Sequence, residues 1–174
     1  MPGGPASLAS LQAELAARPP KLIVLCDLPI DGRAERQFKS YARTITETDI
    51  VNFTNFAGLK LPLFIDAEFC KEHSIFKERV APGLMTASIA AGMLEDILGK
   101  YTLAALGLDR FKFSAPVKIG DTLHSVITVE GLKDVKDGTR GVITVRISVM
   151  NQKGECPLEF WGSFMMRKGK LAGE

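Results

Sequence analysis

The stretch VAPGLMTASIAAGMLEDILG, residues 80–99, decides the fold of this chain. Pro82 suits the first turn of a helix, where a missing backbone N–H breaks no intrahelical hydrogen bond. Small residues crowd the middle of the stretch, and Leu, Ile and Met side chains surround them. A helix that is apolar on several sides is typical of a protein core. We therefore expect residues 82–98 to form a buried helix with another backbone lying close to it.

After this stretch the hydrophobic pattern changes from a helical period to a period of two residues. Within 140–150, the Ile and Val residues at 143, 145, 147 and 149 form one apolar face, and polar side chains alternate with them. Such alternation indicates an antiparallel strand. The predicted strands are 37–45, 111–117, 121–135, 140–151 and 157–169, with turns at 136–138 and 151–154. The pattern predicts an α+β fold in which the sheet wraps around the central helix.

The segment before the central helix contains capping signals. Thr46 is expected to cap a helix that ends at Gly58, with Asp49 completing an Asp version of the capping box. Asp66 is expected to cap a second short helix, AEFCKEH.

The beginning of the chain is interpreted separately. Leu residues at 8, 11 and 15 predict a short amphipathic helix at 7–17, which ends before two prolines. We interpret residues 1–34 as an N-terminal extension that contains this helix, and residues 35–174 as the main domain.

The composition argues against several classes of function. The chain carries 22 basic and 20 acidic residues, and no basic stripe with interleaved aromatics occurs, so nucleic acid is not an expected partner. Its apolar runs are too short to span a bilayer. The N-terminal MPGGPAS lacks the basic region and apolar core of a signal peptide, so we expect a cytoplasmic location.

Residue types for a metal or nucleotide site are few. The three cysteines are widely separated, no CxxC pair occurs, and His73 and His124 are the only histidines, so no metal site is predicted. The sequence contains neither a GxGxxG motif before a helix nor GxxxxGK[ST], and it therefore lacks those phosphate-binding loops.

Four segments, in order, resemble the MaoC-like hydratases and dehydratases of the hotdog fold. They are RTITETDIVNF, the loop that contains PLFIDAEF, RVAPGLMTASIAAGM, and ALGLDRFKFSAPVKIGDTL. The resemblance covers roughly residues 37–169, and the combination of VAPG with PVKIGDTL makes it specific. It implies a hotdog fold, an antiparallel sheet wrapped around a long central helix. It also implies an acyl thioester of coenzyme A or acyl carrier protein as substrate, with no further cofactor.

The stretch FTNFAGLKLPLFIDAEF, residues 53–69, is similar to the catalytic loop of that family. The family loop reads approximately F-x-x-x-(S/T)-G-D-x-N-P-x-H-x-D-x-E-F, and the residues that frame it are kept here. The family's catalytic Asp, however, falls on Leu59, its Asn on Leu61 and its catalytic His on Phe64. Since Leu and Phe cannot transfer protons, the resemblance implies a catalytic loop without its usual acid–base pair.

Further candidate residues follow from the resemblance. The start of the central helix, at Pro82 and Gly83, is the candidate thioester-binding site, where backbone N–H groups would stabilise the thioester oxygen. Asp66 and His73 are weak substitutes for the missing acid and base, because a carboxylate at a helix start usually acts as a cap and His73 ends a charged segment. The candidate pocket-lining residues are Asn55, Leu59, Leu61, Phe64 and Leu84.

Three functions fit this pattern. The first is an acyl-thioester hydratase or dehydratase, a lyase that acts through other groups. The second is a non-catalytic subunit of a heterodimeric dehydratase, which shapes the acyl site while its partner supplies the chemistry. The third is a domain that binds acyl-CoA without converting it. Because hotdog domains join their sheets edge to edge, we expect a homodimer or a heterodimer with a related hotdog chain.

Overall fold

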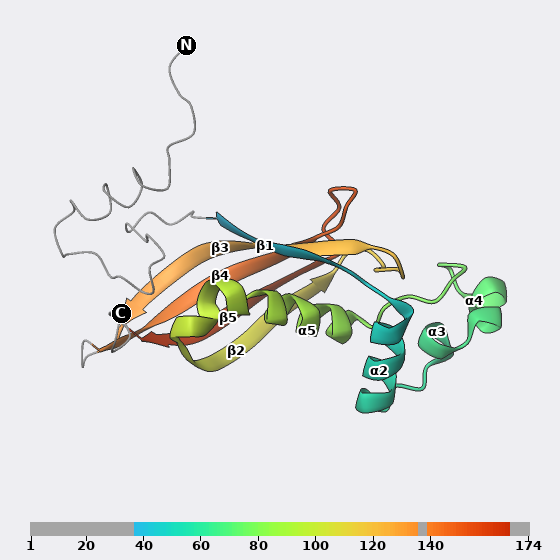
Figure 1. Cartoon of the computed structure of the whole chain (residues 1–174), viewed down its shortest axis with the longest axis horizontal. Helices are drawn as coiled ribbons and strands as arrows, with labels where there is room; N and C mark the ends of the chain where they lie inside the picture. The colour runs from blue at the N-terminus through green and yellow to red at the C-terminus, as the bar shows by residue number, and fades with distance from the viewer. Residues whose placement is uncertain (1–36, 136–138, 168–174) are drawn as a thin grey trace, which may run out of the picture.

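The computed structural model describes residues 37–135 and 139–167 (Figure 1). Strand β1 (Gln37–Thr44) is followed by helices α2 (Glu47–Ala57), α3 (Pro62–Ile65) and α4 (Ala67–His73). The central helix α5 (Gly83–Met93) leads into the short α6 (Glu95–Leu98) and the 3₁₀ turn η1 (Gly99–Tyr101). The remaining strands are β2 (Thr102–Phe113), β3 (Thr122–Asp134), β4 (Arg140–Met150) and β5 (Leu158–Arg167). The predicted extension at 1–34 and the predicted turn at 136–138 lie outside the described residues.

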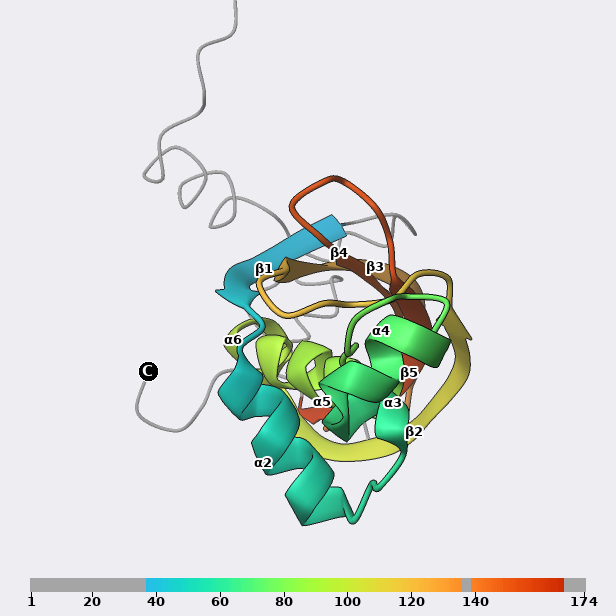
Figure 2. The same cartoon turned by 90° about the vertical axis from the view of Figure 1, so that its right-hand side faces the viewer.

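The five strands form one antiparallel sheet in the order β1-β3-β4-β5-β2. After β1 the chain passes through the helices and returns at the opposite edge as β2, so β1 and β2 are the two edge strands. Figures 1 and 2 show the sheet curving around α5, while α2, α3 and α4 lie together at one end of the domain. This arrangement confirms the predicted α+β hotdog fold.

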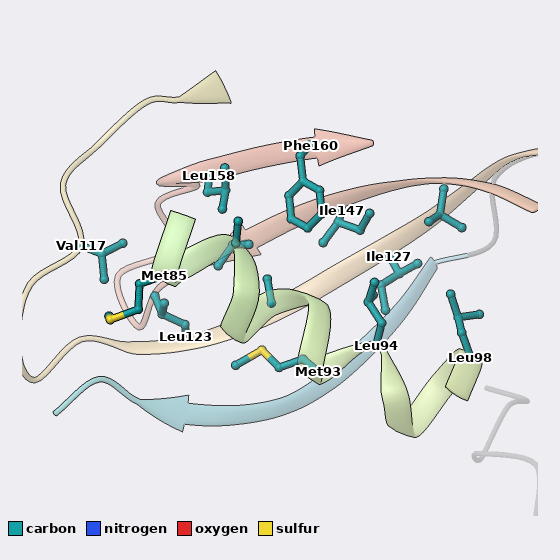
Figure 3. Packing of buried hydrophobic residues seen from close by; sticks show 14 of the residues in the cluster. Met85, Met93, Leu94, Leu98, Val117, Leu123, Ile127, Ile147, Leu158 and Phe160 are labelled. Carbon is teal, nitrogen blue, oxygen red and sulfur yellow. The ribbon is translucent and has the colours of Figure 1, made fainter. Parts of the chain in front are cut away.

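The core lies between the concave face of the sheet and α5 (Figure 3). The predicted apolar face of β4 is the buried one, since Ile143, Val145 and Ile147 are all fully buried. Met85 and Met93 of α5 belong to the same core cluster, and both are almost completely buried. Burial of each large apolar side chain contributes about 1.5–3 kcal/mol, so the helix is stabilised mainly by the sheet that covers it.

The central helix is shorter than the predicted range of 82–98. It ends at Met93, where the Leu94 N–H donates to the Ala91 carbonyl at 3.0 Å, and α6 begins after this tightened turn. Gly92 has low helix propensity and lies immediately before the break. The hydrophobic pattern did not reveal it, because Leu94 and Leu98 are both buried and continue the apolar pattern across the interruption.

The bounds predicted for the first strand after the helix were wrong. The sequence pattern placed it at 111–117, but β2 runs from Thr102 to Phe113. Residues 103–110 are exposed, so the burial on one face that produces an alternating pattern is absent there. Residues 114–117 instead bind neighbouring loops, with Ser114 N–H donating to the Pro157 carbonyl at 2.9 Å.

A bulge in β2 determines which of its side chains face inward. Asp109 pairs with Trp161 and Lys112 with Glu159, so Arg110 and Phe111 together oppose one residue of β5. Arg110 has a φ of 52°, in the left-handed region. The extra residue shifts the alternation of the strand, so that Phe111 packs against the core and Arg110 lies over the Trp161 ring.

The predicted helix caps are confirmed. The Thr46 hydroxyl accepts from the Asp49 N–H at 3.3 Å, and Asp49 Oδ2 accepts from the Thr46 N–H at 2.8 Å. Gly58 ends α2 with a φ of 68°. Burial alone would raise the pKa of Asp49, but hydrogen bonds from Thr46 and the charge of Arg43 outweigh this effect, and the pKa lies below its ordinary value.

Candidate functional site

An apolar pocket of about 480 Å³ lies at the N-terminal end of α5. Its walls come from α3, the loop before α5, the first turn of α5 and the end of β2 with the segment after it. Only Thr86 and Ser114 contribute hydroxyl groups, and no described residue in the lining is acidic or basic. A cavity of this size suits a small apolar ligand. The larger lining side chains include Leu63, Phe64, Phe76, Leu84, Phe113 and Val117.

The Phe113 ring lies against the first turn of α5. A Cβ atom added to Gly83 would be 2.6 Å from this ring, closer than side chains approach one another. Phe113 also stacks on Phe111 with ring centroids 6.3 Å apart, and Phe111 stacks on the buried Phe160 at 5.1 Å. A row of rings thus leads from the core to the pocket, and the glycine leaves room for the last ring beside the helix.

The short helix α3 positions Phe64 at the pocket. Pro62 occupies the first turn of α3, where it disrupts no hydrogen bond. The Cys70 thiol, buried on α4, donates to the Leu63 carbonyl at 3.4 Å and joins the two helices. Phe64 is half-buried in the resulting elbow.

The loop before α5 is held from two sides. On one side, Arg79 forms an ion pair with Glu47 of α2 at 2.5 Å, and this hydrogen bond raises the pKa of the guanidinium. On the other side, Ala81 N–H donates to the Val117 carbonyl at 2.8 Å. These contacts fix the direction in which the chain enters α5.

The start of α5 presents backbone donors beside the pocket. Pro82 is the N-cap residue, it makes no side-chain capping hydrogen bond, and the first turn of the helix contains no acidic residue. The first N–H groups of any helix lack intrahelical acceptors, and the helix dipole makes this end partly positive. A carbonyl oxygen placed next to Gly83 would therefore find hydrogen-bond donors there.

Some of the sequence candidates meet at this pocket. Phe64, Gly83 and Leu84 line the pocket. The buried Pro82 directly precedes Gly83 at the start of α5. The position equated with the catalytic His of the related enzymes is thus part of the pocket, and a phenyl ring occupies it.

Other candidates lie outside the lining. Asn55 is exposed on α2, Leu61 is 57% exposed, and Leu59 is half-buried with its N–H bonded to the Thr54 carbonyl at 2.9 Å. The chain reverses at Gly58, so residues 59–61 form the connection to α3 rather than the pocket wall. The position equated with the catalytic Asp is therefore separate from the pocket in this structure.

Asp66 and His73 are also outside the pocket lining. Asp66 caps α4, since its Oδ1 accepts from the Phe69 N–H at 2.9 Å. His73 ends α4 with a largely exposed side chain, 3.4 Å from a carboxylate oxygen of Glu72. In the structure, Asp66 thus acts as a helix cap and His73 is a surface residue.

Sequence reasoning missed Phe76, Phe113 and Val117 as lining residues. Phe113 was assigned to a strand, and its inward direction depends on the bulge at Arg110, which the sequence pattern did not reveal. Val117 was assigned to the end of the predicted strand 111–117, and it also belongs to the PVKIG segment of the resemblance. The available signal was the position of this segment in the sequence, between the end of one strand and the start of the next.

A second groove of about 540 Å³ lies between β1, α2 and α5. Asn52, Phe56 and Ser88 line it, together with the ion pair of Arg43 and Asp49. Since these two charges neutralise each other, we regard the groove as a weaker candidate than the pocket at Gly83.

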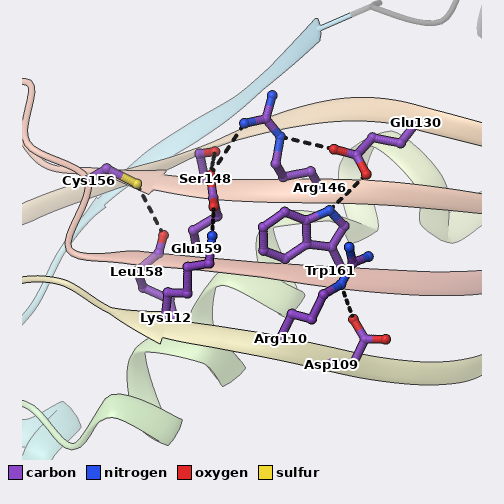
Figure 4. Close-up of polar contacts among 10 residues, drawn as sticks. All are labelled: Asp109, Arg110, Lys112, Glu130, Arg146, Ser148, Cys156, Leu158, Glu159 and Trp161. Atoms are coloured by element: carbon purple, nitrogen blue, oxygen red, sulfur yellow. Dashed lines mark hydrogen bonds and ion pairs between the residues drawn. The ribbon is translucent and has the colours of Figure 1, made fainter.

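The outer face of the sheet carries a charged network around Trp161 (Figure 4). The indole N–H donates to Glu130 at 2.8 Å, and the Arg110 guanidinium lies 4.3 Å from the ring centroid. Arg146 connects Glu130 with Glu159 through ion pairs of 3.2 and 3.4 Å. The described basic and acidic groups of this network pair with one another across strands β2, β3, β4 and β5.

Across residues 37–135 and 139–167, no three His, Cys, Asp or Glu side chains are grouped closely enough to bind a metal ion. Within the same residues, no helix has the length and apolar character needed to cross a membrane.

Comparison with known proteins identifies the family of this chain. The family model described as the MaoC-like domain matches residues 30–151. The chain belongs to the MaoC-like domain family. One relative, the (R)-specific enoyl-CoA hydratase of Rhodospirillum rubrum, is 33% identical over 101 residues, which cover 56% of this chain and 67% of the relative.

A longer relative is the beta-methylmalyl-CoA dehydratase of Chloroflexus aurantiacus, which is 32% identical over 126 residues. The match covers 72% of this MaoC-like chain but 36% of the relative, so the chain spans about a third of that enzyme. Among solved structures, an Archaeoglobus protein described as a monoamine oxidase regulatory protein superposes with a TM-score of 0.72 and 32% identity. The match covers 79% of this chain and 92% of that protein.

Proposed function

We propose that this MaoC-like chain binds an acyl thioester of coenzyme A or acyl carrier protein, with the acyl group in the pocket beside Gly83. The observation that carries the proposal is the position of the apolar pocket of about 480 Å³ at the start of α5. A thioester has an apolar chain and a polar carbonyl group, and this site offers apolar walls next to helix N–H donors. No further cofactor is required for binding.

The helix start would hold the thioester carbonyl. Hydrogen bonds from the N–H groups near Gly83 and the dipole of α5 both favour negative charge on the carbonyl oxygen. Favourable helix-end interactions contribute about 0.3–1 kcal/mol when exposed and up to about 2 kcal/mol when partly buried. This contribution orients the ligand, whereas burial of its acyl chain supplies most of the affinity.

We further propose that the chain binds thioesters without hydrating them efficiently. Each positioned acid or base contributes about 10²–10⁴-fold to a reaction of this kind. By the resemblance, the family's His falls on Phe64 and its Asp on Leu59, and no described residue in the pocket lining is acidic, basic or a histidine. We therefore expect this chain to bind acyl thioesters, as the names of its relatives suggest, but not to convert them efficiently.

Isothermal titration calorimetry with hexanoyl-CoA and free CoA tests the binding proposal. We expect saturable binding of hexanoyl-CoA that is tighter than that of free CoA, because only the thioester places apolar carbons in the pocket. Equal affinity for the two ligands would refute the proposal. Incubation with crotonyl-CoA tests the second part, and hydration at a rate typical of enzymes, about 1–10³ per second, would contradict it.

A second candidate function, a subunit that pairs with another hotdog chain, is favoured by the edge strand β2. Its residues 103–110 are all exposed, and Leu103, Leu106 and Leu108 are each about half exposed. An open edge with large apolar side chains is a site for pairing with another strand. A second hotdog chain, identical or related, would cover it. The HadBC complex of Mycobacterium tuberculosis has a similar fold, with a TM-score of 0.63 and 19% identity, a likeness that shows the fold alone.

Sedimentation of the purified chain tests this pairing. We expect a dimer that the Leu106→Arg substitution converts to monomers, because the new charge would be buried at the joined edges. Ile75→Arg is the matched control, since Ile75 is 86% exposed and lies outside β2. Unchanged dimers of Leu106→Arg would contradict pairing through β2. We also propose a cytoplasmic location, because Cys70 and Cys156 are free thiols in the described part of the chain and thiols stay reduced in the cytoplasm.

A further inference from the structure

No described side chain in the lining of the pocket at Gly83 is charged, and the N–H groups at the start of α5 are taken up by the thioester carbonyl in the proposed function. Thr86 and Ser114 are the polar side chains among its described lining residues, and the Thr86 hydroxyl points at the Pro82 carbonyl, 3.5 Å away. A carboxylate transferred into such surroundings loses its hydration without gaining an ion pair. A methyl group at the same place gains from leaving water. The pocket therefore distinguishes ligands by the end of the acyl chain.

The nearest basic residues along the chain are bound elsewhere. Four of them adjoin lining residues in sequence: Lys77, Arg79, Lys112 and Lys118. Lys118 donates to Glu78 at 2.6 Å, and Lys112 reaches the outer face of the sheet, where its ammonium lies 3.3 Å from Glu159. Arg79 pairs with a carboxylate of α2, and Lys77 donates to a backbone carbonyl of α4. None of these four charges is directed at the pocket.

We propose that the pocket selects uncharged acyl groups and rejects acyl groups that end in a carboxylate. This inference rests on the proposed function, since it assumes that an acyl thioester binds beside Gly83. It separates the chain from the Chloroflexus relative, whose name specifies the acyl group of a dicarboxylic acid. The expected ligand class is thus the thioester of a simple fatty acid rather than the monothioester of a dicarboxylic acid.

Calorimetric titration of the full chain with hexanoyl-CoA and adipoyl-CoA tests the selection. The two ligands have the same acyl chain length, and they differ at the far end, which is a methyl group in one and a carboxylate in the other. We expect hexanoyl-CoA to bind at least about tenfold more tightly than adipoyl-CoA. Along a series of unbranched acyl-CoA ligands, each methylene that enters the pocket should tighten binding about fourfold.

The outcomes separate this inference from the proposed function. Equal affinities for hexanoyl-CoA and adipoyl-CoA, or tighter binding of adipoyl-CoA, would overturn the selection while leaving thioester binding intact. If neither ligand binds more tightly than free CoA, the proposed function fails and the selection fails with it.

A substitution at the pocket provides a second readout. Leu84 lines the pocket and is 61% exposed, so Leu84→Arg should fold and bring a cation to the wall. We expect this variant to bind adipoyl-CoA more tightly than the unaltered chain does, and hexanoyl-CoA less tightly. Ile75→Arg adds the same charge at a largely exposed residue outside the lining and should change neither affinity. Equal effects of the two substitutions would overturn the assignment of the selection to this pocket.

Discussion

Arg110 provides a test of the bulge that directs β2 toward the pocket. Its φ of 52° costs a residue with a side chain about 1–2 kcal/mol relative to glycine. Its guanidinium lies 4.3 Å from the Trp161 ring centroid, a contact that contributes about 0.5–1 kcal/mol at an exposed site. The ion pair with Asp109 joins two largely exposed groups and contributes little.

The two contributions predict different stabilities for two substitutions. Arg110→Ala loses the contact with Trp161 and keeps the backbone strain, so its free energy of unfolding should fall by about 0.5–1 kcal/mol. Arg110→Gly loses the same contact but relieves the strain. After subtraction of the entropic cost of glycine in a strand, the Gly variant should be about 0.5–1 kcal/mol more stable than the Ala variant.

Lys112 is the matched control for this comparison. It lies in the same strand and is exposed, with its ammonium 5.0 Å from the Trp161 ring centroid, and it is not among the residues with positive φ. There the usual order should hold, with the Gly variant about 0.5–1 kcal/mol less stable than the Ala variant. Urea unfolding followed by circular dichroism measures all four variants. The same order of Ala and Gly at both positions would refute the bulge argument.

Three further predictions concern the pocket and α2. Gly83→Ala should displace the Phe113 ring and weaken hexanoyl-CoA binding at least about tenfold. Gly92→Ala is the control, because a Cβ atom added there has no neighbour within 4 Å, and it should leave the affinity unchanged. Equal affinities of the two variants in calorimetry would contradict the close approach at Gly83. Phe64→His should place a base in the pocket and raise the rate of crotonyl-CoA hydration about 10²-fold over the unaltered chain. Leu61→His places the same group outside the lining and should give no gain. Equal hydration rates of the two variants in a spectrophotometric assay would contradict this prediction. Asp49→Asn should lower the free energy of unfolding by about 1 kcal/mol at neutral pH, as expected for a damaged capping box. Because the pKa of Asp49 is depressed in the folded state, this difference should be full at neutral pH and diminish as the pH falls through that depressed pKa. Urea titrations that show a difference independent of pH would argue against the assignment.

The sequence predicted the fold where burial on one face leaves a regular pattern. The inner face of β4 and the caps at Thr46 and Asp66 were predicted correctly, because alternation and capping chemistry are local properties. β2 was displaced, since an exposed edge strand has no buried face to impose alternation. The break after Met93 was missed for the opposite reason, because residues on both sides of it are buried.

The site was predicted in part. The resemblance to the family's catalytic loop and central helix made Phe64 and Gly83 candidate site residues. In the structure, these two residues line one pocket. The same alignment gave no information on side-chain direction, so Leu59 and Leu61 were expected in a lining that excludes them. Phe113 reaches the pocket through a bulge and a stack of rings, which are tertiary features with no signature in the spacing of residues.

The most direct test of the central claim is a crystal structure of the chain with hexanoyl-CoA. The acyl chain should lie between Phe64 and Phe113, with the thioester oxygen within hydrogen-bonding distance of the first N–H groups of α5. Density for the acyl chain in the groove beside Asn52 and Ser88, with the pocket at Gly83 vacant, would contradict the account.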